Sequence, residues 1–325
     1  MDLRRTEEQQ QLRATLRRLF DRRLAALVDA LPDAPRHDAA ADLADAQAVG
    51  LTGLGLPEEC GGAGTFADLV VAHEEIGRGL GGPLFMALAS AGRLLRHATG
   101  GSRGELVAAV AEGRWDVLGR SAQTDGVEWQ EEPSGVDLSS WTLRVAADLA
   151  DEHGLELDGD GRRLVLSEIA VVAAAQQLGG SRAVLERTID HVKTREQFDR
   201  PIGTFQAVQH QLADVATELD AVSLAVAQAA WAVDAALAPD ERCRLADIAA
   251  LTAATAFRRA TLVAHQLHGG MGFVLDSPLH LWSARAIADP AVRRFRRDVL
   301  DDLATASGIT AEGVTAPQDR RLIRR

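Results

Sequence analysis

The sequence has no tyrosine, few other aromatic residues and only two cysteines among its 325 residues. Because strands are rich in β-branched and aromatic side chains, this scarcity, set beside abundant alanine and leucine, favours helices over a large sheet. The cysteines, Cys60 and Cys243, have no metal-ligand spacing around them. We therefore interpret them as two free thiols in a reducing cytoplasm.

Positive charge is also scarce, since 35 Lys and Arg stand against 47 Asp and Glu, for a net charge of -12. This balance argues against a nucleic acid as the main partner, and we interpret the arginine-rich stretch 320–325 as a solvated terminus. No uncharged apolar run approaches the ~20 residues that a membrane span needs. Charges from Asp2 onward leave no apolar signal core, so we expect a cytoplasmic protein without a membrane span.

Apolar residues at intervals of three and four predict several helices in the first third of the chain. Thr6 is placed to cap the first of them, with Glu7 and Glu8 in a first turn where the helix dipole favours acids. A stretch rich in glycine, residues 53–64, interrupts the series and is expected to be a loop. The helices are expected at residues 6–30, 39–49, 67–78 and 84–97.

The rest of the chain changes character twice. Residues 114–162 hold short apolar runs between turn residues, which predict a small β region. From Arg163 onward long helices return, and the clearest has an apolar seam from Phe205 to Val233 that suits packing in an antiparallel bundle. A second long helix is expected over 242–266, and a last helical segment after Pro290.

The most specific pattern lies in the second half of the chain. Arg195–Gln206 reads REQFDRPIGTFQ, and Gln266–Phe273 reads QLHGGMGF. Upstream, residues 53–64 read GLGLPEECGGAG, and EEIGR follows at 74–78. The first two stretches resemble the flavin-contacting signatures of the acyl-CoA dehydrogenase family, in that family's order. The upstream stretches resemble its N-terminal helical domain, and the chain is therefore identified as a member of that family.

The resemblance implies a mainly α, acyl-CoA dehydrogenase-like fold. Its expected parts are an N-terminal helical domain (1–113), a shortened middle β region (114–162) and a C-terminal four-helix bundle domain (163–325). It implies FAD as the cofactor and α,β-dehydrogenation of an acyl-CoA thioester as the reaction. The partners it implies are a second subunit of the family or further copies of this chain, and an electron-transfer flavoprotein.

The first signature supplies five candidate cofactor-binding residues. Arg195, Gln197 and Phe198 match the family motif that reaches a neighbouring subunit's FAD, and Phe205 and Gln206 complete it. Arginine offers a fixed fork of donors to a pyrophosphate, and phenylalanine covers an apolar part of the cofactor. On spacing alone, the same cations would also suit a helix end, where they satisfy the last carbonyls.

The second signature supplies three more. Gln266, Gly269 and Gly270 match the motif that meets the adenosine and pyrophosphate end of the cofactor. Glycines let backbone N–H groups approach a phosphate closely, although a glycine pair after a helix is also a common C-terminal cap. The chain departs from the family at Asp199, where glycine is usual, and an acidic side chain there disfavours a nearby pyrophosphate.

Two further patterns are weaker signals. The glycines at 61–64 lack the preceding strand that a dinucleotide fingerprint needs, and the resemblance makes this stretch a substrate-side loop instead. His265 and His268 lie three residues apart, but no acidic or cysteine ligands cluster with them in the sequence. We therefore predict no metal site.

The family's catalytic base has no direct match. Acyl-CoA dehydrogenases remove an α-proton with a carboxylate while a hydride leaves the β-carbon for the flavin. Most members carry this glutamate where the present chain has Arg293, and others where it has Ile169, and neither residue is a base. Glu168 becomes the catalytic candidate if the register slips by one residue. Without that slip it turns about 100° away and is a surface or helix-start glutamate.

Three interpretations stay open at this point. The chain is a flavoenzyme complete in itself, or a short, degenerate subunit that clamps FAD held mainly by a complete partner, or a family member repurposed for other flavin chemistry in biosynthesis. The short chain, the cut-down β region and the missing carboxylate favour the second. Similar bacterial heteromers act on steroid side-chain thioesters.

Overall fold

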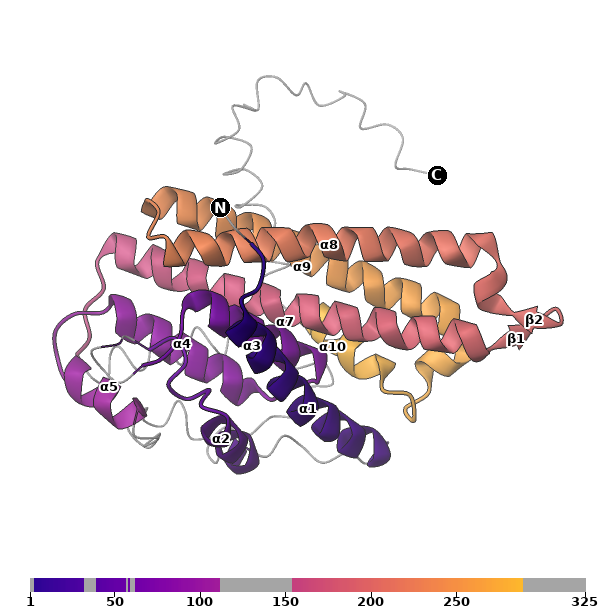
Figure 1. The fold of residues 1–325 in the computed structure, drawn as a ribbon, viewed down its shortest axis with the longest axis horizontal. Helices are drawn as coiled ribbons and strands as arrows, with labels where there is room; N and C mark the ends of the chain where they lie inside the picture. Colours follow the sequence, from indigo (N-terminus) through magenta and orange to yellow (C-terminus); the bar gives the residue numbers. More distant parts are fainter. Residues whose placement is uncertain (1–2, 32–38, 57, 59–61, 112–153, 289–325) are drawn as a thin grey trace, which may run out of the picture.

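The computed structural model describes residues 3–31, 39–56, 58, 62–111 and 154–288. In these ranges the chain is helical almost throughout, with a two-stranded hairpin and two 3-10 turns (Figure 1). The elements are α1 (Glu7–Asp29), α2 (Ala39–Ala48), α3 (Phe66–Arg78), α4 (Pro83–His97), α5 (Arg103–Ala111), α7 (Gly159–Thr194), β1 (Glu196–Gln197), β2 (Arg200–Pro201), η3 (Ile202–Thr204), α8 (Gln206–Asp234), α9 (Pro239–His268), η4 (Gly269–Phe273) and α10 (Leu279–Ala288).

The first helix starts where its sequence predicts. The Thr6 hydroxyl accepts from the backbone N–H of Gln9, and the Gln9 side chain accepts from the N–H of Thr6, which together form a capping box. Thr65 and Asp68 form the same arrangement at the start of α3. These reciprocal bonds satisfy backbone donors that a helix start would otherwise leave free.

The long helices α7, α8 and α9 lie side by side and pack with α10 into a bundle (Figure 1). The predicted seam of α8 supplies Val215, Leu219, Val222 and Val226 to the core, each almost fully buried. Burying such side chains stabilises the fold by roughly 1.5–3 kcal/mol each. The predicted mainly α fold is therefore confirmed, and its core joins the bundle to the N-terminal helices.

The helix α3 lies against α7 because two glycines let the backbones meet. A Cβ atom built on Gly179 would overlap the carbonyl oxygen of Glu74, and one on Gly77 would overlap that of Gln176. Neither helix would tolerate a larger side chain at these positions without moving apart. The contact fixes the N-terminal helices on the bundle.

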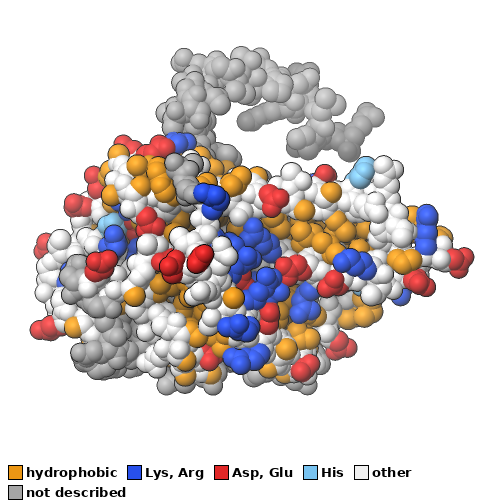
Figure 2. All heavy atoms as spheres, viewed as in Figure 1, with side chains coloured by type: hydrophobic (Ala, Val, Ile, Leu, Met, Phe, Trp, Pro, Cys, Tyr) orange, Lys and Arg blue, Asp and Glu red, His pale blue; other side chains and the backbone are white. Residues whose placement is uncertain are grey.

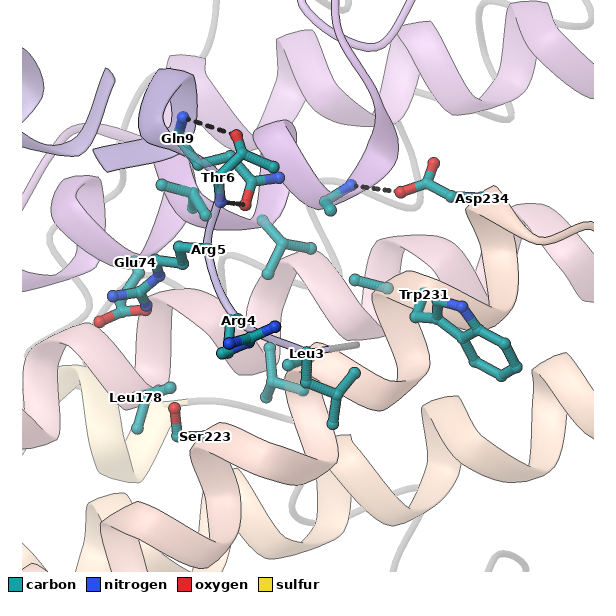
Figure 3. A pocket seen from close by; sticks show the side chains of 16 residues that line it. Leu3, Arg4, Arg5, Thr6, Gln9, Glu74, Leu178, Ser223, Trp231 and Asp234 are labelled. Carbon is teal, nitrogen blue, oxygen red and sulfur yellow. Dashed lines mark hydrogen bonds and ion pairs between the residues drawn. The ribbon is translucent and has the colours of Figure 1, made fainter. Parts of the chain in front are cut away.

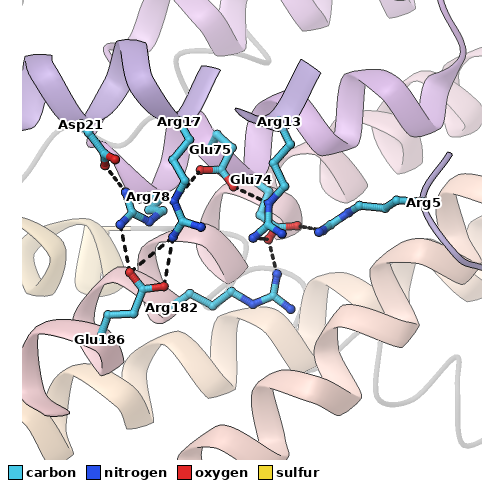
Figure 4. Close-up of polar contacts among 9 residues, drawn as sticks. All are labelled: Arg5, Arg13, Arg17, Asp21, Glu74, Glu75, Arg78, Arg182 and Glu186. Carbon is cyan, nitrogen blue, oxygen red and sulfur yellow. Dashed lines mark hydrogen bonds and ion pairs between the residues drawn. The ribbon is translucent and has the colours of Figure 1, made fainter. Parts of the chain in front are cut away.

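A network of ion pairs adds α1 to this contact (Figure 4). The buried Glu75 pairs with Arg13 of α1 at 2.7 Å, and the buried Glu74 pairs with Arg5 and Arg182. Figure 2 shows Lys and Arg side chains gathered over the middle of this face, where α1 crosses α3 in Figure 1. The EEIGR stretch thus holds three helices together.

Several sequence expectations differ from the structure or fall outside it. The bundle begins at Gly159 rather than after 162, because Asp158 caps α7 by accepting from the N–H of Gly161. The run 155–157 forms only an isolated bridge between Glu156 and Thr99, not a strand. The structure also contains two helices that the sequence analysis did not predict, α5 and α10. Residues 114–153 of the expected β region, and the segment after Pro290, lie outside the described residues, so the three-part division stays a prediction.

Among the described helices, α7 alone is long and apolar enough to cross a membrane. However, most of its apolar part is buried inside the protein. A central bundle helix has this composition because its neighbours cover it on all sides.

Candidate cofactor and substrate sites

The first signature folds into the hairpin at the end of α7 (Figure 1). The strands pair Glu196 with Pro201 and Gln197 with Arg200, so Phe198 and Asp199 form a two-residue turn. Both have positive φ, 54° and 61°, as a type I′ turn requires. The turn thus places a phenylalanine and an aspartate where glycine or asparagine is usual.

The side chains of this hairpin point away from the rest of the chain. Phe198 is 87% exposed, and Arg195 has no ion-pair partner among the described residues. The Gln197 amide donates only to the neighbouring Glu196 carbonyl at 2.8 Å. The half-buried Phe205 forms the base of the turn, with Phe198 edge-on at 6.1 Å and the Arg200 guanidinium over its ring at 4.2 Å. Donors and an apolar ring are therefore presented outward.

The second signature lies beside the first, although the two are far apart in sequence. His191 near the end of α7 and His268 at the end of α9 stack with ring centroids 4.2 Å apart. Gln266, Gly269 and Gly270 are exposed at this end, and a Cβ atom on either glycine would meet no heavy atom within 4 Å. The backbone there is open to an approaching group.

His265 lies in the same region without metal ligands. Its Nε2 contacts the Ser283 hydroxyl, and its ring stacks on Phe273 at 4.8 Å. No group of three His, Cys, Asp or Glu side chains suited to a metal occurs within the described ranges. His265 therefore has a packing role in this structure.

Glu168 lies far from these residues, in the early part of α7. It is 1% exposed and pairs with three basic side chains from two other helices. Arg93 Nη1 lies 3.4 Å from its Oε2, His97 Nε2 lies 3.0 Å from its Oε1, and Arg242 donates to the same Oε1. Burial alone would raise the pKa of Glu168, but the His97 hydrogen bond and the charges of Arg93 and Arg242 together lower it.

The two candidate sites therefore lie at opposite ends of one helix. At about 1.5 Å of rise per residue, Glu168 and Arg195 are roughly 40 Å apart. Phe205 and Gln206 accompany Arg195, with Gln206 exposed in the first turn of α8. One chain cannot bring Glu168 and the hairpin to the same reacting atoms.

A separate cavity of about 390 Å³ lies between the N-terminal segment, α3 and α8 (Figure 3). Its lining includes the apolar side chains of Val70, Val226 and Ala230 and the charged side chains of Arg5 and Asp234. Asp234 accepts from the backbone N–H groups of Phe66 and Ala67 and so caps α3. None of the predicted site residues lines this cavity.

Comparison with known proteins assigns this fold and these motifs to one family. Residues 161–299 match the family model of the acyl-CoA dehydrogenase C-terminal domain, and residues 6–114 match that of the N-terminal domain. Acyl-CoA dehydrogenase IpdE2 of Mycobacterium tuberculosis is 30% identical over 90% of this chain and 95% of its own length. The chain belongs to the acyl-CoA dehydrogenase family.

Solved structures agree on the fold. The ChsE4-ChsE5 complex from Mycobacterium tuberculosis matches with a TM-score of 0.68 and 21% identity, over 93% of this chain and 99% of that one. A variant of the steroid ACAD Tcur3481-Tcur3483 matches with a TM-score of 0.70 and 25% identity, over 94% and 99%. The family is one of oxidoreductases that act on the CH–CH bond of an acyl-CoA with FAD as cofactor.

The residues at the hairpin end fit a phosphate-bearing cofactor. An exposed arginine without an ion-pair partner within the described ranges is a ready donor fork for a pyrophosphate. The two open glycines leave room for backbone N–H groups to meet phosphate oxygens. Two exposed carboxylates of the same hairpin, Glu196 and Asp199, oppose a negatively charged group there.

Sequence reasoning missed the partners of Glu168. Arg93 comes from α4 and Arg242 from α9, so no spacing in the sequence connects them with Glu168. The one available signal was an arginine inside the apolar pattern of α4, where a charged side chain needs a buried partner.

Proposed function

We propose that this chain is one subunit of a heteromeric acyl-CoA dehydrogenase, in which it holds FAD bound mainly by a longer family member. Arg195, Gln197 and Phe198 would contact the pyrophosphate side of the neighbour's cofactor, with Phe205 and Gln206 supporting the hairpin. Gln266, Gly269 and Gly270 would meet the adenosine end. The observation that carries the proposal is the outward presentation of Arg195 and Phe198, both of which are exposed at the end of α7.

The surroundings of Glu168 support the proposal that this chain helps to hold FAD while its partner supplies the catalytic base. FAD, when bound, accepts the hydride that leaves the acyl β-carbon. The α-proton must go to a carboxylate with free lone pairs and a raised pKa. In this chain both oxygens of Glu168 already accept from cationic or imidazole donors, and its pKa is lowered. The partner subunit would then supply the base.

A chain that uses Glu168 as its own base is the second candidate. It is favoured by one observation, the position of Glu168 one residue from the family's alternative base position. In that case substrate binding would have to separate Glu168 from Arg242 or His97. Replacement of Glu168 by glutamine would then abolish turnover in the assembled enzyme. If the partner subunit supplies the base instead, the same substitution would lower the stability of this chain and leave turnover by the assembled enzyme largely intact.

The names of similar proteins suggest the substrate class. ChsE4-ChsE5 is a complex of two chains, and Tcur3481-Tcur3483 is described as a steroid ACAD. We infer that the present chain acts on a bulky acyl-CoA such as a steroid-derived thioester, in the cytoplasm and with an electron-transfer flavoprotein as the acceptor. Turnover of short linear acyl-CoAs without turnover of bulky ones would contradict this assignment.

The experiment compares flavin content with and without a partner. The chain is purified alone and co-expressed with a longer acyl-CoA dehydrogenase of the same organism, and visible absorption and native mass are measured. We expect little flavin in the isolated chain and stoichiometric flavin in a hetero-oligomer. A homo-oligomer of this chain with one flavin per subunit would overturn the proposal.

A further inference from the structure

The cluster around Glu168 contains more positive charge than negative charge. Arg93 and Arg242 are two guanidinium groups, and both pair with the single carboxylate of Glu168. The negative charge of Asp234 also attracts the Arg93 guanidinium, but the Asp234 carboxylate already accepts hydrogen bonds from two backbone N–H groups of α3. In the part of the chain that the structure describes, one guanidinium charge is therefore left without a paired anion, and a buried unpaired charge is costly.

The same cluster also holds unused hydrogen-bond donors. Arg93 is 1% exposed, and its Nε and Nη2 have no hydrogen-bond partner among the described residues. Within the same ranges, the buried Nε of Arg242 also has no partner. The Phe66 ring lies 5.2 Å from the Arg93 guanidinium and covers one of its faces, and it offers the Nε and Nη2 of Arg93 no hydrogen-bond acceptor. Buried donors of this kind call for a ligand or a bound solvent molecule.

The cluster is reached from one side. The side chains of His97 and Arg242 keep 14% and 12% of their surface exposed, against 1% for Arg93. His97 is at the end of α4 and Arg242 is in the first turn of α9. Arg93 lies behind them, with its Nη2 against Gly55, where an added Cβ atom would be only 2.8 Å away. Gly55 lies in the glycine-rich stretch that the sequence carries at 53–64.

We propose that Arg93, His97 and Arg242 form a binding site for the carboxylate of a small ligand, with Glu168 neutralising one of the two guanidiniums. A water molecule would satisfy the free donors but not the remaining positive charge. A carboxylate does both, because its two oxygens match the planar donor fork of arginine.

The carboxylate has two possible sources, and they share this chemistry. It is either a free dicarboxylate or the far end of an acyl group on CoA. The second source rests on the function proposed above, whereas the first does not. Binding of a free dicarboxylate can be measured on the chain without any flavin. The carboxylate site can therefore be disproved without disproving the proposed function, and the reverse also holds.

The test is calorimetric titration of the full chain with glutarate, with neutral glutaramide as the matched ligand, at constant ionic strength. Glutarate should bind saturably and glutaramide should not. In Arg242→Gln the Kd for glutarate should rise about tenfold or more, since a charge-assisted bond is lost. Arg163→Gln, an exposed arginine on α7 that pairs with Asp160 and Asp240, should leave the Kd unchanged. If Arg242→Gln fails to fold, His97→Gln takes its place.

Glutaryl-CoA and butyryl-CoA separate the two sources. If glutaryl-CoA binds more tightly than both butyryl-CoA and glutarate, and Arg242→Gln removes that advantage, the ligand is an acyl group. If glutarate binds as tightly as glutaryl-CoA, the ligand is a free carboxylate. Absence of saturable binding for both glutarate and glutaryl-CoA, or an equal Kd in Arg242→Gln, would overturn the site.

Discussion

His191 and His268 stack ring on ring, with planes 18° apart, and so join the ends of α7 and α9. Each histidine closes the helix from which one of the two signatures continues. The hairpin and the glycine turn therefore keep their relative position through this single aromatic contact and the bundle behind it. Sites built on such rigid helix ends are held more accurately than sites on free loops.

Replacing His191 should loosen this arrangement. His191→Ala removes the stacked ring, and we expect the affinity of the assembled complex for FAD to fall by about three- to tenfold, as loss of an aromatic pair costs ~0.5–1.5 kcal/mol. His191→Phe keeps a ring and should restore most of the affinity. The measurement is fluorescence titration of the apo-complex with FAD. Equal affinity in all three proteins would show that the stack does not position the site.

Asp199 occupies a turn position where glycine would fit the backbone better than aspartate does. Its φ of 61° lies in the left-handed region that favours glycine. Under the proposed function, its charge would lie near the pyrophosphate. We expect Asp199→Gly to bind FAD more tightly and to leave the unfolding midpoint unchanged or slightly raised. Asp199→Asn, which removes the charge but keeps a side chain, separates the two effects. Weaker FAD binding in both variants would mean that the carboxylate assists the cofactor.

Two glycine-to-alanine substitutions, one in the contact between α3 and α7 and one on an open helix surface, should change stability in opposite directions. Gly179→Ala places a methyl group on the Glu74 carbonyl and should lower the free energy of unfolding by about 2–4 kcal/mol, as overpacking of a core does. Gly104→Ala, in the first turn of α5, meets no atom within 4 Å and should raise it by about 0.5 kcal/mol. Urea unfolding of both variants gives the values. A neutral Gly179→Ala would show that the helices can separate without loss.

Glu168 should make stability depend on pH in the acid range. Because its folded pKa is lowered below the ordinary 4.5, its contribution is present above pH 4.5 and is lost as the pH falls through the folded pKa. Glu168→Gln removes one partner of a buried ion cluster and should cost about 3–5 kcal/mol near neutral pH. It should also flatten the decline in stability below pH 4.5. The check is urea unfolding of both proteins from about pH 7 to about pH 3. Parallel curves would contradict the ion-pair geometry.

The elements that sequence predicts best are those that depend on local pattern. The capping box of Thr6 needs only residues three apart, and the apolar seam of α8 repeats every three or four residues. Both therefore appear in a single stretch of sequence. The helix starts and ends of α1, α3 and α9 agree with the expected ranges to within about three residues for the same reason.

The Glu168 cluster could not be predicted in this way. It joins Arg93, His97, Glu168 and Arg242 from three helices, and only the packed bundle brings them together. The turn at Phe198 and Asp199 is also hidden from the sequence, because a bulky phenylalanine is not typical of positive φ, although aspartate adopts it more readily. The location of the hairpin at the far end from Glu168 follows from the length of α7, which the sequence pattern did not delimit.

The most direct test of the account is the affinity for FAD of the assembled complex that carries Arg195→Gln. Lys193→Gln, an exposed charge in the last turn of the same helix, is the matched control. We predict that Arg195→Gln weakens FAD binding by about tenfold or more, because a charged donor fork to the pyrophosphate is lost, while Lys193→Gln changes it little. Unchanged FAD affinity in Arg195→Gln would contradict the claim that this chain holds the cofactor of a neighbouring subunit.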